Sequence, residues 1–184
     1  MAGLRRMINR LRRDESGYMV VEAVLVLPMM LWAFLALYSF WDAYRAATTI
    51  QKAAYSISDL ISREQRPVNA AFINGMRNAM NQMIPPRLDT ELRVTSVEWN
   101  ETDARFEAQW SCVSGSAAPK LTTASLVDVA SKIPGMADGN TVILVETWVD
   151  YEPALDIGVT EKRVGQFIVT RPRYQPRIGL TGAC

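Results

Sequence analysis

The chain has 184 residues, a formal net charge of +1, no histidine and two cysteines. Without histidine, catalytic triads with a histidine base and most transition-metal sites are excluded, and no carboxylate pair, lysine or tyrosine stands out as catalytic. We therefore expect no enzyme activity, no metal and no cofactor. The charge is uneven, because residues 1–17 carry five arginines against two acidic residues. A basic segment before an apolar one indicates a membrane partner and no nucleic acid.

An apolar run covers residues 18–41, and Glu22 is its only charged residue. As a helix it would be about 36 Å long, and a bilayer's hydrocarbon core is about 30 Å thick. The arginines predict that residues 1–17 form a cytoplasmic leader and that 18–41 cross the inner membrane, with the C-terminal part in the periplasm. A cleaved secretory signal is the weaker alternative, because its apolar region is shorter and ends at a small-residue site. A plain single-pass anchor has the same hydropathy.

The start of this run carries a specific pattern. A basic leader, Gly17, a hydrophobic or aromatic residue and Glu22 at the fifth position after the glycine precede a long apolar helix. This order resembles the class III signal of type IV pilins and pseudopilins. More narrowly, "GYMVVEAVLVLPMM" resembles TadE/TadF-like pseudopilins of tight-adherence (Tad/Flp) pilus systems. A weaker similarity lies in "TVILVETWVDYEP" and "RPRYQPRIG". The pattern does not separate the TadE type from the TadF type.

The resemblance implies a function without catalysis. A prepilin peptidase would cut between Gly17 and Tyr18, on the cytoplasmic side, and commonly methylate the new amine. The mature chain would be a minor subunit in the assembly of an adhesive pilus. Its partners would be the peptidase, other pilin and pseudopilin subunits, and the inner-membrane assembly platform. The resemblance also implies a pilin-like fold.

Glu22 has two interpretations. After cleavage, the amine of Tyr18 would lie one helical turn away and pair with the carboxylate, or the carboxylate would pair with a neighbouring subunit's amine. Alternatively, Glu22 lies near the cytoplasmic interface and reaches headgroup water.

Gly17 and Pro28 each have a structural interpretation as well. Gly17 suits a peptidase pocket that admits no side chain, or else simply starts a helix near a capping residue. Pro28 removes one helical hydrogen bond and predicts a kink, which membrane helices tolerate.

Beyond residue 41 the pattern is amphipathic. Ile50, Ala54, Ile57 and Ile61 form one apolar stripe, so we expect a single helix over 18–63. A second helix is predicted over 67–84, between Pro67 and the Pro85–Pro86 pair. Its apolar face, with three methionines, is expected to be core rather than a binding surface. Residues 42–86 would thus be a periplasmic helical extension.

Residues 87–184 predict a small periplasmic α+β domain. "ELRVTSVEW" and "ARFEAQWSC" indicate a hairpin, and in the second strand Phe106, Ala108, Trp110 and Cys112 alternate with polar residues on one predicted buried face. "TVILVETWVDY" is expected to be central in the sheet, and "GQFIVTR" follows a loop that contains 156–158. A short helix is predicted within 121–133. The expected fold is α+β, with the long N-terminal helix packed on a small antiparallel sheet.

Cys112 and Cys184 would lie in an oxidising compartment. One disulfide between them is the favoured interpretation, and two free thiols are the alternative.

The leading functional prediction is a pseudopilin or minor pilus subunit, membrane-bound or incorporated in an extracellular pilus. The main alternative is an uncleaved single-pass inner-membrane protein whose periplasmic domain binds a partner or ligand. A membrane-anchored enzyme ranks third.

Overall fold

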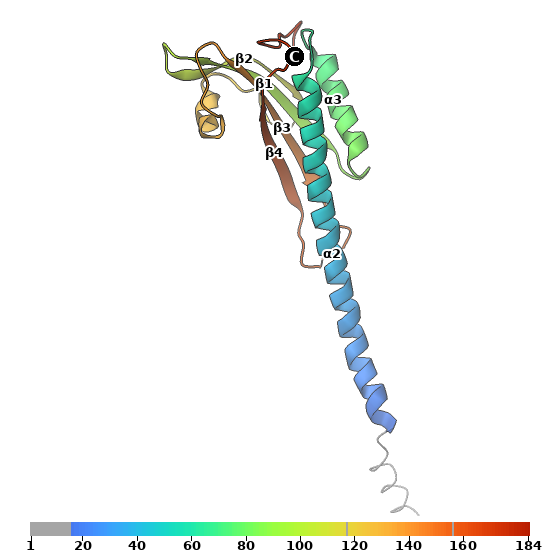
Figure 1. Ribbon diagram of the computed structural model, residues 1–184. Coiled ribbons are helices and arrows are strands. Elements are labelled where there is room, and N and C mark those ends of the chain that lie inside the picture. Colours follow the sequence, from blue (N-terminus) through green and yellow to red (C-terminus); the bar gives the residue numbers. More distant parts are fainter. Residues whose placement is uncertain (1–15, 117, 156) are drawn as a thin grey trace, which may run out of the picture.

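The computed structural model describes residues 16–116, 118–155 and 157–184 (Figure 1). The expected basic leader therefore lies almost wholly outside the described residues, as does Asp156 of the predicted loop. Two α-helices and a four-stranded sheet make up most of the described chain. They are α2 (Ser16–Ser62), α3 (Ala70–Met83), β1 (Thr90–Asn100), β2 (Arg105–Ser114), β3 (Thr141–Tyr151) and β4 (Lys162–Thr170).

The expected fold class is confirmed: this is an α+β protein in which a long, apolar N-terminal helix packs on a small antiparallel sheet. The strand order is β2-β1-β3-β4, and every neighbouring pair is antiparallel. β3 is an interior strand, as its β-branched and aromatic sequence predicts, and most of its residues are buried. The upper part of α2 lies against β3 and β4, while α3 lies against β1 and β2 (Figure 1).

α2 is one continuous helix through Pro28, close to the predicted 18–63. α3 starts later than predicted. Pro67 is not in the helix, because Val68 forms a parallel bridge with Leu180 and Asn69 is the N-cap. The Asn69 side chain accepts a hydrogen bond from the backbone N–H of Phe72 at 2.8 Å, which caps the first turn.

The short helix predicted within 121–133 is absent, and two 3₁₀ turns stand in its place: η1 (Ser125–Asp128) and η2 (Ala130–Lys132). The Thr122 backbone N–H donates to the Ser125 hydroxyl at 2.9 Å, and that hydroxyl donates to the Thr122 carbonyl at 3.0 Å. Such local side-chain bonds compete with helical ones and favour a turn.

The main core lies between the two helices and the sheet. The predicted stripe of α2 is buried there, and Ile50, Ile57 and Ile61 have no exposed surface. In α3, Met80 is fully buried and Met76 packs against this core, whereas Met83 remains 44% exposed. The methionine face is therefore core over most of its length.

A second, smaller core lies on the other face of the sheet, where Leu126 of η1 and Ile133 pack on Val142 and Leu144. This face corrects the prediction for β2. Phe106 and Ala108 pack on the small core, whereas Trp110 and Cys112 belong to the main core. The pairing of β1 with β2 shifts between Ser96 and Val97, so β2 has one extra residue there. A bulge of this kind reverses the face to which later side chains point.

Candidate functional site

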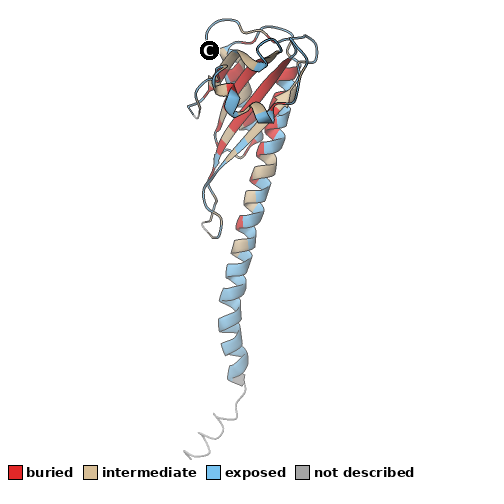
Figure 2. Cartoon of the chain, turned by 90° about the vertical axis from the view of Figure 1, so that its left-hand side faces the viewer, coloured by how far each residue is buried: buried red, intermediate tan, exposed pale blue. Residues whose placement is uncertain are grey.

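α2 is the candidate functional element because its two halves differ completely in environment (Figure 2). Residues 17–34 are exposed throughout, and large apolar side chains such as Leu27 and Leu31 are 63% and 59% exposed. This is the helix of the described chain that is long and apolar enough to cross a membrane. An apolar surface of this size needs lipid or other helices around it.

Gly17 and Tyr18 lie in the first turn of α2, and the Tyr18 side chain is 71% exposed. Apart from its chain neighbours and the backbone of its own helix, a Cβ atom built on Gly17 would meet no atom of the described residues within 4 Å, and the backbone there is not left-handed. Neither packing nor backbone geometry therefore requires glycine at this position. Gly17 lies in the first turn of α2, where glycine is tolerated better than in a helix interior, so the fold permits glycine here without requiring it.

Glu22 is exposed on the same helix, one turn beyond Tyr18. It forms no ion pair with any other described residue. A charge in this apolar surface, without an ion-pair partner among the described residues, is costly once lipid or other helices cover it. Pro28 lies six residues further along α2, which continues on both sides of it, and the kink at Pro28 stays a prediction.

A polar cluster ties the end of the apolar run to the sheet. The Arg87 guanidinium donates to the Asp42 carboxylate at 2.6 Å, and the Tyr151 hydroxyl donates to the same oxygen at 2.8 Å. Arg87 also lies over the Tyr151 ring, 5.5 Å from its centroid. These contacts join α2, the segment before β1, and the end of β3. The cluster therefore adds to the main core in holding the sheet on α2.

Each member of this cluster has a shifted pKa. The hydrogen bond from Arg87 lowers the pKa of Asp42, and the same bond raises the pKa of Arg87. Burial, and then the hydrogen bond to Asp42, raise the pKa of Tyr151. Sequence reasoning missed the cluster because 109 positions separate Asp42 from Tyr151. The available signal was an acidic residue directly after a membrane-length apolar run.

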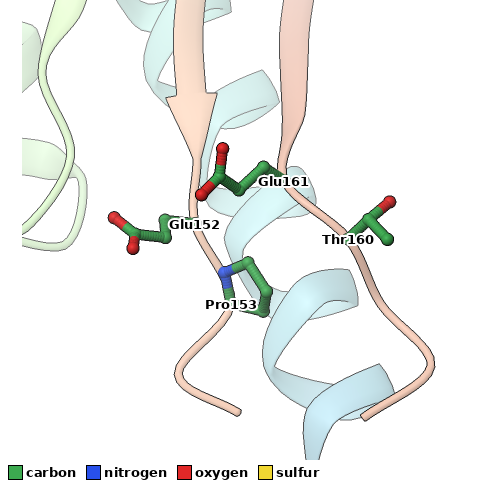
Figure 3. Close-up of a pocket in the computed structure, with 4 residues that line it drawn as sticks. All are labelled: Glu152, Pro153, Thr160 and Glu161. Atoms are coloured by element: carbon green, nitrogen blue, oxygen red, sulfur yellow. The ribbon is translucent and has the colours of Figure 1, made fainter. Parts of the chain in front are cut away.

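The connection between β3 and β4 descends along α2 below the cluster (Figure 1). Glu152 and Pro153 leave β3 beside Thr160 and Glu161, which lead into β4, and these four residues line a shallow pocket (Figure 3). Together with Asp150, Glu152 is one of the acidic residues flanking Tyr151. Among the described residues, no group of three or more histidine, cysteine or acidic side chains is arranged to hold a metal ion.

The disulfide between Cys112 and Cys184 is present, which confirms the favoured interpretation of the two cysteines. It joins β2 to the C-terminus at the end of the domain far from the exposed half of α2 (Figure 1). Beside it, the Trp110 indole N–H donates to the Ile178 carbonyl at 2.7 Å. The pair is therefore structural and lies away from the membrane-side features.

A search with protein-family models, curated proteins and solved structures found no match to this chain. The functional argument therefore depends on the residues of α2 and on the geometry around them.

Proposed function

We propose that this protein is a TadE/TadF-like pseudopilin, a minor subunit that takes part in assembling a Tad-type adhesive pilus. In this proposal α2 crosses the inner membrane with its N-terminus in the cytoplasm and the sheet in the periplasm. A prepilin peptidase cuts the chain between Gly17 and Tyr18, and the mature subunit then meets other pilin-like subunits at the assembly platform.

The observation that carries the proposal is the spacing of Gly17, Tyr18 and Glu22 at the start of an exposed apolar helix. Packing against the described residues does not require glycine at position 17, whereas a peptidase pocket that excludes side chains would require it. Cleavage there would create an amine on Tyr18, one turn from Glu22, which has no ion-pair partner among the described residues. A carboxylate and an amine four residues apart on a helix are well placed to pair.

The two environments of α2 supply further support. A helix anchored at one end by a folded domain and bare at the other can move from lipid into a bundle of similar helices without changing its own structure. Both surroundings are apolar, so the same exposed residues suit each. Within either, Glu22 gains from a cationic partner, since an isolated charge in an apolar bundle is strongly unfavourable.

Substitution of Glu22 tests this proposal. Cells that express only the Glu22→Ala protein should process it normally but assemble about tenfold fewer pili, which corresponds to losing roughly 1.4 kcal/mol of subunit affinity. Leu25→Ala is the matched control, because Leu25 is 69% exposed on the same part of α2 and carries no charge. Processing is read from the mobility of the chain on a gel, and pili are counted by electron microscopy.

Normal pilus numbers with Glu22→Ala would contradict the role of the carboxylate. An unprocessed wild-type chain would instead favour the alternative function, an uncleaved single-pass membrane protein with a binding domain.

A further inference from the structure

The β3–β4 connection touches α2 at the end of its apolar run. The Ser39 hydroxyl donates to the Leu155 carbonyl at 3.4 Å, besides a bond to its own helix. Ser39 is only 3% exposed, although its neighbour Phe40 is 56% exposed. Gly158 has a left-handed backbone, and a Cβ built on it would lie 3.6 Å from the Phe40 ring. The connection therefore packs closely on one side of α2.

This contact lies at the level where a bilayer around α2 would end. A hydrocarbon core of about 30 Å takes about 20 helical residues. The apolar run ends at Trp41, only two positions beyond Ser39. Leu35 and Ala36 are half-buried, whereas residues 17–34 are all exposed, so cover on α2 begins just before the end of the run.

The chemistry of the connection changes along its length. Its two ends carry charge, with Glu152 on the β3 side and Glu161 on the β4 side (Figure 3). Leu155 and Ile157, in its lower part, are apolar and only half-buried. The charged residues are thus at the ends that join the strands, and the apolar residues are in the middle, toward the exposed half of α2. Apolar side chains in the headgroup region with charges just outside it are the pattern of interfacial segments.

We propose that the β3–β4 connection is a second membrane contact, which places Leu155 and Ile157 against the bilayer surface on the sheet side of the membrane. The partner is a phospholipid surface. The charged residues at the two ends of the connection, Glu152 and Glu161, keep the contact at headgroup depth and out of the hydrocarbon.

A helix and a loop that both contact the membrane restrict the orientation of the domain more than a helix alone. A single helix leaves its domain free to rotate and tilt on the membrane, whereas a helix plus an adjacent surface loop fixes the face that the domain presents. The Asp42, Arg87 and Tyr151 cluster directly above the connection holds the domain on α2 in that position. The inference depends on α2 crossing the membrane, which is part of the proposed function, but not on pilus assembly.

The test is site-directed fluorescence in the full chain, reconstituted in vesicles of phosphatidylethanolamine and phosphatidylglycerol. Because both native cysteines are in a disulfide, a bimane label reacts with one introduced cysteine. The test positions are Ile157→Cys and Ala154→Cys, which report independently if one of them disturbs the fold. Leu31→Cys, in the exposed run, is the lipid control, and Val127→Cys, 76% exposed on η1, is the water control. Quenchers are lipid with a nitroxide near the top of its acyl chain, and aqueous iodide.

We expect the nitroxide lipid to quench Leu31 and both loop positions, and iodide to quench Val127 strongly. Loop labels that behave like Val127 would overturn the inference while leaving the membrane-spanning helix intact. Loop labels that neither agent reaches would overturn it too, since the connection would then be buried against α2. If iodide quenches the Leu31 label and the nitroxide lipid does not, α2 does not cross the membrane, and the inference is contradicted as well.

Discussion

The lower and upper halves of α2 are both rich in apolar residues, yet only one is part of the protein's own core. In the lower half Leu27 and Leu31 are more than half exposed, whereas in the upper half Ile50 and Ile57 are completely buried. The difference lies in how the apolar residues are arranged. The lower half is apolar on every side, which suits lipid or a bundle of helices, and the upper half has one apolar stripe, which suits a sheet.

One continuous helix can therefore have halves that suit two different environments. The upper half is part of the domain's core, and the lower half is exposed and apolar enough to cross a membrane. Truncations in the upper half should therefore lower the free energy of unfolding, whereas truncations in the lower half should leave it unchanged.

The largest expected effect on stability comes from the disulfide. Replacing Cys112 and Cys184 together by serine should lower the free energy of unfolding of the domain by up to about 4 kcal/mol, since the bridge closes a loop with a sequence separation of 72. Thermal unfolding of the full chain in detergent, followed by near-ultraviolet circular dichroism, measures this. A double variant that unfolds at the wild-type temperature would show that the disulfide does not contribute to the stability of the domain.

A matched pair of truncations tests the comparison of the two halves directly. Ile57→Ala should lower the free energy of unfolding by about 3 kcal/mol, because it opens a cavity in the main core. Leu27→Ala removes a side chain from the bare half and should leave domain unfolding unchanged. Equal effects of the two variants in the same detergent would mean that the lower half is also part of the cooperative unit.

A smaller effect is expected at the junction. Asp42→Asn should cost about 1 kcal/mol, because Arg87 keeps access to water and loses only part of its interaction. The pKa of Asp42 is lowered in the folded protein, so its contribution is complete above the unfolded value of about 3.9 and disappears as the pH falls through the lowered folded value. The stability difference between wild type and Asp42→Asn should therefore shrink below about pH 4. A difference that is constant from pH 7 to pH 3 would contradict this assignment.

Much of the fold followed from local patterns. The long apolar run, the periodic stripe of α2 and the β-branched and aromatic sequence of β3 are strong local signals, and the predicted helix and strand are found at each. Two predictions were wrong because local side-chain hydrogen bonds changed the backbone structure. The Asn69 cap makes α3 begin later than predicted, and the bonds of Ser125 favour 3₁₀ turns where a short α-helix was predicted. The bulge in β2 could not be predicted from its sequence, since apolar and polar residues alternate without interruption through the position of the extra residue.

The candidate site was only partly accessible from sequence. Gly17, Tyr18 and Glu22 are neighbours on one helix, so their relation follows from helical geometry alone. The partners of Asp42 come from distant segments, and the position of Leu155 beside Ser39 depends on where β3 ends and how the sheet packs on α2. Such contacts are set by tertiary packing, and no local pattern encodes them.

The most direct test of the central claim is the N-terminus of the protein purified from its own membranes, determined by intact mass and N-terminal sequencing. We predict a mature chain that begins at Tyr18, with the mass of one added methyl group. Gly17→Leu is the control, and it should remain uncut while α2 and the domain stay folded, since a side chain at position 17 meets no other element among the described residues. A wild-type chain that still begins upstream of Tyr18 would contradict prepilin processing, and Glu22 would then be an interfacial glutamate of an uncleaved membrane anchor.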